Sequence, residues 1–213
     1  MKHFSTILFA TSVLFTFSAN ASDNNNFSYL GISIQNSSYD DIAFSPDIEA
    51  AEFLPDVYTK SMSDTGERVF VGYHFNKYFA VETGITSHGE PDYLVYREVT
   101  DLDDAITKET IQRGNFKTFS GDVRLIGTYS ISDKMFFKAQ LGSLFWDNEF
   151  DYISGNINEL AKETKNETGI SLLTGFGLGY GFSKNFAISI DFENTKIAEI
   201  NTQTVAISMM YRL

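Results

Sequence analysis

Histidine and hydroxyl side chains are the first candidates for chemistry, because the chain has three histidines and no cysteine. His88 follows Thr86 and Ser87, and a histidine beside a serine is the core of many nucleophilic hydrolases. In an extended segment, however, Ser87 and His88 point to opposite faces, and only Thr86 shares a face with His88. His74 would lie about 30 Å away if the residues between are extended. The sequence therefore predicts no catalytic residue.

Acidic clusters are the second candidates, because carboxylates bind calcium. Residues 101–104 read Asp-Leu-Asp-Asp, and Asp40 and Asp41 open another acidic segment. Calcium takes about six to eight oxygen ligands from a shaped loop, and the spacing of an EF-hand with its glycine is missing. The alternating glycines from Gly175 to Gly181 are not a phosphate-binding loop, because they lie within an expected strand that no helix follows. We expect neither a metal nor a cofactor.

The charge and the cysteine count exclude further classes. The formal net charge is −12, and nucleic-acid binding needs clustered lysine and arginine. Without cysteine, neither a disulfide framework nor a thiolate site can form. The fold must therefore be stabilised by packing and strand pairing, and nucleic acid is not an expected partner.

The first residues have the pattern of an export signal. Lys2 and His3 precede an apolar run over 4–17, and Ala19-Asn20-Ala21 supplies small residues for cleavage. A membrane-spanning helix needs about 20 apolar residues, which is more than this run offers. We expect a signal peptide over residues 1–21 and a single domain over residues 22–213.

The elements that would position any site are strands. Tight turns are expected at 75–78, 131–135 and 182–186, between runs in which every second residue is apolar, while 38–65, 89–115 and 147–166 are long and polar. Eight strands are predicted at 27–37, 67–75, 78–88, 116–130, 135–146, 168–182, 186–195 and 201–213. Short turns at one end and long loops at the other are typical of a transmembrane β-barrel, with the turns in the periplasm.

The two faces of these strands favour a membrane barrel over a soluble one such as a lipocalin. In the sixth predicted strand Phe176 and Leu178 share one face, while Gly175, Gly177 and Gly179 share the other. Small residues facing inward leave room for bulky neighbours in a narrow barrel. Aromatic residues near the strand ends would form a girdle at the membrane surface: Tyr73, Phe75, Tyr78, Phe79, Tyr129, Phe182 and Tyr211. The predicted fold class is all-β, an eight-stranded antiparallel up-and-down transmembrane β-barrel.

The last residues carry a resemblance to a known family. Val205, Ile207, Met209 and Tyr211 alternate up to Leu213 at the end of the chain. Together with the hairpin order and the signal peptide, this pattern resembles small outer-membrane barrels of Gram-negative bacteria, the OmpA-like transmembrane-domain family with its OmpX relatives. Many members end in an aromatic residue that the barrel-assembly machinery recognises, whereas this chain ends in leucine.

The resemblance implies where interior charges would lie and what they would do. In OmpA-like barrels, charge pairs inside the barrel form a plug. The corresponding candidates are Glu82, Arg124, Lys138 and Asp191, expected as one lumen charge cluster that is structural or gates the pore. An unpaired charge inside would be costly, so they should pair.

The resemblance also implies a function and partners. We expect a non-enzymatic protein of the Gram-negative cell outer membrane that contributes to envelope integrity and has long acidic extracellular loops. Alternatives are a surface adhesin or receptor acting through the first two loops, and a lipid A-modifying enzyme near His88. Expected partners are outer-membrane lipid, lipopolysaccharide and the barrel-assembly machinery. The barrel is expected to be a monomer.

Overall fold

The computed structural model describes residues 26–40, 57–59, 62–100, 106–156, 159–198 and 200–213. The expected signal peptide and the acidic residues 101–104 lie outside these ranges and stay predictions. The described residues form ten strands: β1 (Phe27–Tyr39), β2 (Val57–Thr59), β3 (Met62–His74), β4 (Phe79–Ser87), β5 (Asp92–Thr100), β6 (Ile106–Ser130), β7 (Met135–Asn156), β8 (Glu159–Gly181), β9 (Phe186–Ile197) and β10 (Ile200–Arg212). Among these residues no helix is long and apolar enough to cross a membrane.

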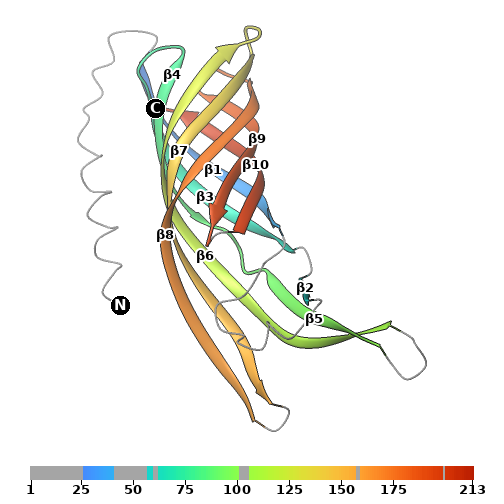
Figure 1. The fold of residues 1–213 in the computed structure, drawn as a ribbon. Coiled ribbons are helices and arrows are strands. Elements are labelled where there is room, and N and C mark those ends of the chain that lie inside the picture. Colours follow the sequence, from blue (N-terminus) through green and yellow to red (C-terminus); the bar gives the residue numbers. More distant parts are fainter. Residues whose placement is uncertain (1–25, 41–56, 60–61, 101–105, 157–158, 199) are drawn as a thin grey trace.

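Eight of the strands close into an antiparallel barrel, which confirms the predicted fold class. The sheet runs β6-β4-β3-β1-β10-β9-β8-β7, and a further ladder joins β6 to β7. Each strand pairs antiparallel with its neighbour, from the β1–β10 ladder to the β6–β7 ladder (Figure 1). Closure leaves the barrel wall without an unpaired edge, which a strand-built protein needs in hydrocarbon. The short β2 and β5 attach outside this ring, with β5 paired to the first half of β6.

Three short turns join strands at one end of the barrel, as predicted. The amides of Phe75, Ile131 and Phe182 donate to the carbonyls of Phe79, Met135 and Phe186 at 3.0, 2.8 and 3.1 Å. Side-chain oxygens of Asn76, Ser132 and Ser183 accept further backbone amides within the turns. Asparagine and serine favour tight turns because their side chains replace backbone partners in this way. We call this the short-turn end, and the opposite end the long-strand end.

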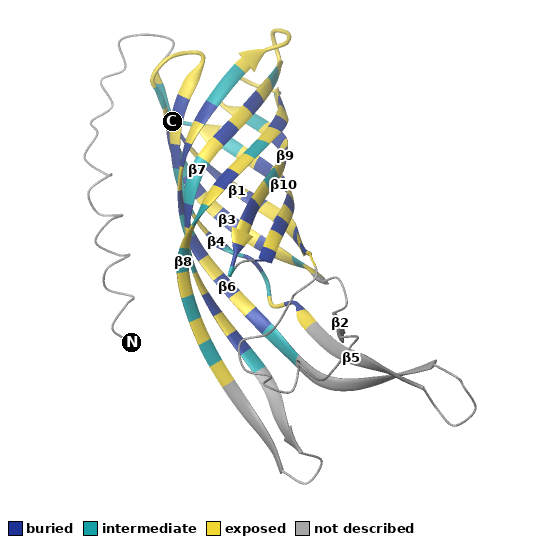
Figure 2. Ribbon diagram, viewed as in Figure 1, coloured by how far each residue is buried: buried dark blue, intermediate teal, exposed yellow. Residues whose placement is uncertain are grey.

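The barrel wall is apolar outside and mixed inside, as the alternation predicted. Figure 2 shows buried and exposed residues alternating along the strands of the barrel. The outward side chains include Ile34, Leu141 and Ile207, which are 64, 53 and 61% exposed. All seven aromatic residues predicted for the girdle are exposed. A closed barrel with a continuous apolar outer surface is suited to a lipid surrounding.

The inward glycines of β8 make room for side chains of neighbouring strands. A Cβ atom at Gly177 would overlap Asp191, and one at Gly179 would overlap the ring of Phe136. At Gly175 it would lie 2.7 Å from Nε2 of Gln140. These glycines cost some strand stability, but larger residues would not fit beside the side chains that fill the lumen.

The strands at the long-strand end are longer than predicted. Residues 89–115 and 147–166 were expected to be loops. Instead, β5 pairs with the first half of β6, and the β7–β8 ladder continues to Asn156 and Glu159. Polar composition did not prevent pairing here, because each extended strand finds backbone partners on a neighbour. The β8–β9 ladder stops at Thr174 and Asn194, so β8 continues beyond the barrel wall as an edge (Figure 1).

Candidate functional site

The candidate site is the barrel lumen, where inward charged side chains from four strands meet. Arg68 on β3 forms ion pairs with Glu82 on β4 and with Asp122 on β6, both at 2.8 Å. Two hydrogen bonds, at 3.0 and 2.8 Å, join Arg68 to both oxygens of Asp122. The hydroxyl of Tyr29 donates to the other oxygen of Glu82 at 2.9 Å. Both oxygens of each carboxylate are thus engaged.

Arg124 on β6 continues this network across the lumen. Its Nε lies 2.8 Å from Oδ1 of Asp122, and its Nη1 lies 2.6 Å from Oε1 of Glu193 on β9. Gln140 on β7 accepts a hydrogen bond from Arg124 and donates one to Glu193, each at 3.1 Å. The network formed by Arg68, Glu82, Asp122, Arg124 and Glu193 therefore links strands on opposite sides of the barrel.

A second pair lies apart from this network. Nζ of Lys138 on β7 is 2.9 Å from Oδ2 of Asp191 on β9. Ser189 and Ser208 donate hydrogen bonds to the same oxygen at 2.9 and 3.1 Å. The other oxygen, Oδ1, is buried and has no hydrogen-bond partner among the described residues. Asp191 therefore depends on Lys138 and two hydroxyls.

The structure divides the four residues that the sequence suggested as one lumen cluster. All four are almost fully buried. Lys138 pairs with Asp191, whereas Glu82 and Arg124 face each other across the β4–β6 ladder and are bridged by Arg68 and Asp122. Whether these groups gate a pore remains a proposal.

The sequence analysis did not select Arg68, Asp122 or Glu193 for the cluster. Glu193 is the one that reaches the network from β9. Alternation places it on the inward face of its strand, but alternation does not show which charges meet across the lumen. A carboxylate from β9 was needed to balance Arg124, and no signal in the sequence identified which one it would be.

Burial makes the pairing of these charges important. The five network residues carry two positive and three negative formal charges, and the donors of Tyr29 and Gln140 face the carboxylates. Removing a charge from water costs several kcal/mol, and only good geometry with further hydrogen bonds compensates for that cost. The network meets this condition and fills the middle of the lumen with polar atoms.

His88 lies inside the barrel. It is 5% exposed, and its Nε2 is 2.8 Å from Oγ of Ser120 on the neighbouring β6. The amide nitrogen of Gln35 is 3.3 Å from Nδ1. Because an amide nitrogen donates, Nδ1 accepts, and Nε2 carries the proton that it donates to Ser120. In this tautomer His88 has no free lone pair with which to activate the serine.

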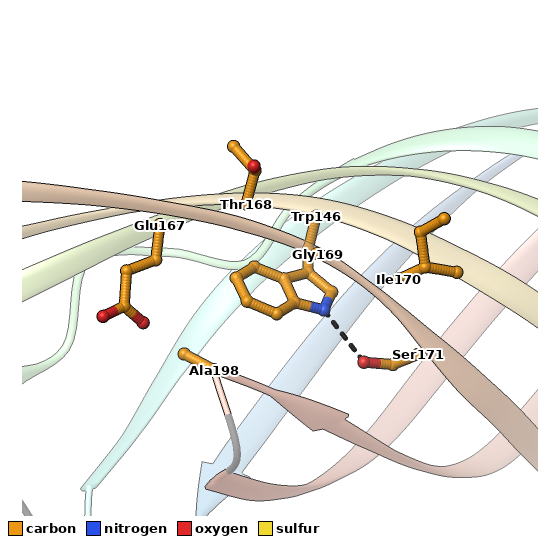
Figure 3. A pocket seen from close by; sticks show the side chains of 7 residues that line it. All are labelled: Trp146, Glu167, Thr168, Gly169, Ile170, Ser171 and Ala198. Carbon is orange, nitrogen blue, oxygen red and sulfur yellow. Dashed lines mark hydrogen bonds between the residues drawn. The ribbon is translucent and has the colours of Figure 1, made fainter.

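A hollow of about 430 Å³ lies at the long-strand end, beside the edge of β8. Trp146 on β7 lies opposite Gly169 in the ladder, and its Nε1 donates to Oγ of Ser171 at 2.9 Å. In Figure 3 the indole lies beside Ala198, with the carboxylate of Glu167 nearby. A Cβ at Gly169 would overlap the indole ring, so Trp146 covers the glycine backbone. The hollow combines one aromatic surface with a few polar groups.

Metal binding finds no support in the described part of the chain. No group of three or more histidine, cysteine, aspartate or glutamate side chains there is arranged to hold an ion. The acidic residues 101–104 lie outside the described ranges, so the absence of a metal site from those residues is still a prediction.

Comparison with known proteins places this geometry in a family. A model described as the outer membrane protein beta-barrel domain matches residues 7–212. Outer membrane protein A of Serratia marcescens is 25% identical over 130 residues, which are 60% of this chain. The match covers 31% of that relative's own length.

Two solved structures share the fold. The attachment invasion locus protein Ail of Yersinia pestis is 16% identical, with a TM-score of 0.51 over 90% of this chain and 100% of that chain. Neisserial surface protein A is 12% identical, with a TM-score of 0.52 over 87% of this chain and 97% of that chain. At these identities the likeness establishes the barrel architecture.

Proposed function

Because this chain belongs to the outer membrane protein β-barrel domain family, whose members lie in the outer membrane of Gram-negative bacteria, we propose that it is a non-enzymatic barrel contributing to envelope integrity. The observation that carries this proposal is the combination of an apolar outer wall and a lumen filled by paired charges. An eight-stranded barrel has room for little more than its own side chains. Such a barrel is suited to strengthening a membrane.

The orientation follows from the rule for bacterial barrels, in which short turns face the periplasm and longer segments face outside. The short-turn end is accordingly periplasmic, and the extended halves of β6, β7 and β8 stand outside the cell. Lipid contacts the apolar outer wall. Lipopolysaccharide meets its outer border, the barrel-assembly machinery acts on β10, and the folded protein is a monomer.

The extended strands favour a second candidate function, that of a surface adhesin or receptor. The β7–β8 ladder continues for ten residue pairs beyond Trp146, from Asp147–Thr168 to Asn156–Glu159. The backbone ladder between β8 and β9 ends at Thr174 and Asn194, so the preceding part of β8 does not pair with β9. An uncovered edge offers backbone groups to an extended segment of another protein. The sequence analysis placed this role in the first two loops, and the β7–β8 hairpin is a further candidate for it.

The third candidate, a lipid A-modifying enzyme, has less support. Among the described residues, the Ser120–His88 pair most resembles the nucleophile and base of a hydrolase. However, His88 donates to the serine, and an amide instead of a carboxylate faces its other nitrogen. In a serine hydrolase the serine donates its hydrogen bond to the histidine, and a carboxylate accepts the proton of the other ring nitrogen.

A shortened hairpin separates the first two functions. Replacing residues 152–163 by Asn-Gly keeps the register, because Asp151 and Thr164 then close a two-residue turn. A strain without the protein should be more sensitive to detergent, and both the wild type and the shortened variant should restore resistance. Unchanged detergent resistance in the deletion strain would refute the envelope proposal. Loss of attachment to host cells by the shortened variant alone would establish the adhesin.

A further inference from the structure

A cavity of about 340 Å³ opens in the lumen at the short-turn end. Its lining is basic, although the chain as a whole carries a formal net charge of −12. Lys77, Lys138, Lys184 and Arg212 are among the residues that line it. Glu82 is the one carboxylate among the described residues that line the cavity. The cavity therefore concentrates positive charge in an acidic protein.

The deep charges of the cavity are already satisfied. Glu82 is bound by Arg68 and Tyr29, and Lys138 is bound by Asp191. The positive charges at the mouth differ from these. Within the described part of the chain, no ion pair involves Lys77, Lys184 or Arg212. Three cationic residues without an ion pair in the described part of the chain thus line one cavity.

Arg212 is held in place by an aromatic stack. Its guanidinium carbon lies 4.1 Å from the centre of the Phe27 ring, and Phe27 stacks on His74 with 4.5 Å between ring centres. The backbone of Arg212 is also fixed, because its amide donates to the carbonyl of Asn185 at 2.8 Å and its carbonyl accepts from the Asn185 side chain at 3.1 Å. A fixed guanidinium loses less freedom on binding an anion than a mobile one.

We propose that this cavity is a binding site for a phosphate group presented from the periplasm, with Arg212 as its main ligand and Lys77 and Lys184 beside it. Phosphate fits because three separate cations can share its oxygens, and arginine binds phosphate with two parallel hydrogen bonds. Phe27, Phe136 and Met210 provide apolar surface for the remainder of the ligand. The phosphate belongs either to a soluble molecule or to a phospholipid headgroup of the inner leaflet. The inference depends on the orientation given under the proposed function.

The test uses the folded protein in zwitterionic detergent micelles and follows backbone amide shifts by NMR. Inorganic phosphate is the probe, and chloride at equal ionic strength is the reference. We expect saturable shifts at Asn185 and Arg212 with phosphate, and apparent affinity at least tenfold weaker in Arg212→Gln. Lys184→Gln, at an exposed turn position, should weaken binding without disturbing the fold. The matched control is Lys134→Gln, because Lys134 lies in a short turn but does not line the cavity.

The outcomes separate specific binding from general attraction to a basic rim. Absence of saturable shifts, or equal losses in Lys134→Gln and Arg212→Gln, would overturn the proposal. Phosphate-free maltoside micelles with and without added phosphatidylglycerol then identify the source. Displacement of phosphate by phosphatidylglycerol indicates a headgroup, and unchanged phosphate binding indicates a soluble ligand. A barrel that supports detergent resistance but binds no phosphate would refute this inference and leave the envelope function intact.

Discussion

The guanidinium of Arg124 and the carboxylate of Glu193 meet across the barrel lumen, with 2.6 Å between Nη1 and Oε1. Arg124 belongs to β6 and Glu193 to β9, and β7 and β8 lie between these strands around the wall. Their contact therefore spans the interior and does not follow the sheet. Both side chains are almost fully buried, so each charge depends on its partner.

Removing Arg124 should strongly destabilise the protein. Arg124→Ala leaves Glu193 and Asp122 buried with fewer partners, and breaking a buried pair typically costs about 3–5 kcal/mol. Glu193→Ala added to Arg124→Ala should recover part of that loss. The measurement is urea unfolding in lipid vesicles across the double-mutant cycle. Strictly additive losses would mean that the two residues do not interact.

The same substitution should open the lumen. If the network plugs the pore, conductance in a planar bilayer should rise in Arg124→Ala relative to the wild type. Lys138→Met provides the comparison, because Lys138 belongs to the separate pair with Asp191. Heat-dependent gel mobility shows whether both proteins are folded. Equal conductance of the folded wild type and the folded Arg124→Ala variant would remove support for the plug.

Gly177 should not tolerate even one additional methyl group. A Cβ there would overlap Oδ1 of Asp191 and approach the backbone of β9, and such overpacking costs about 1–3 kcal/mol. Gly181→Ala on the same strand is the control, because its nearest atoms would be 3.9 Å away. We expect a clear loss of unfolding free energy for Gly177→Ala and almost none for Gly181→Ala. Similar results for both would contradict the packing described for β8.

A charge introduced on the outer wall should destabilise the barrel more strongly the closer it lies to the middle of the membrane. Leu141 lies in the middle of the outward run from Met135 to Phe145, so Leu141→Arg should cost about 2–4 kcal/mol in a lipid refolding titration. Gln203 faces outward, two residues from Val205, which is the last outward apolar residue toward the long-strand end of β10. Gln203→Arg should cost only about 0–1 kcal/mol. Equal costs would mean that the outer wall does not face hydrocarbon.

The buried Ser120–His88 pair should have no catalytic effect on lipid A. Mass spectra of lipid A should be the same from cells with the wild type, with Ser120→Ala and with no barrel at all. A modification that requires the wild type and disappears in Ser120→Ala would show that the serine is a nucleophile and that the proposed non-enzymatic role is wrong.

The sequence alone determined the eight strands of the barrel wall, the short turns and the two faces of the wall, but not how far the strands extend at the long-strand end. Alternation of apolar residues determined which side chains point outward, including Leu178 and Ile207, because a strand repeats every two residues and a slip by one would reverse both faces. Asn76, Ser132 and Ser183 marked the short turns through their local hydrogen bonds with backbone amides. These signals are local, so each can be read from a few neighbouring residues.

Only the tertiary structure decided which partners meet. Alternation placed Glu82, Arg124, Lys138 and Asp191 inside, but the closure and stagger of the barrel paired Lys138 with Asp191 and gave Arg124 to Glu193. The same closure brought Ser120 to His88 and allowed β7 and β8 to continue beyond the wall. These contacts join residues far apart in the chain. Their selection depends on barrel geometry, which a pattern of single residues does not contain.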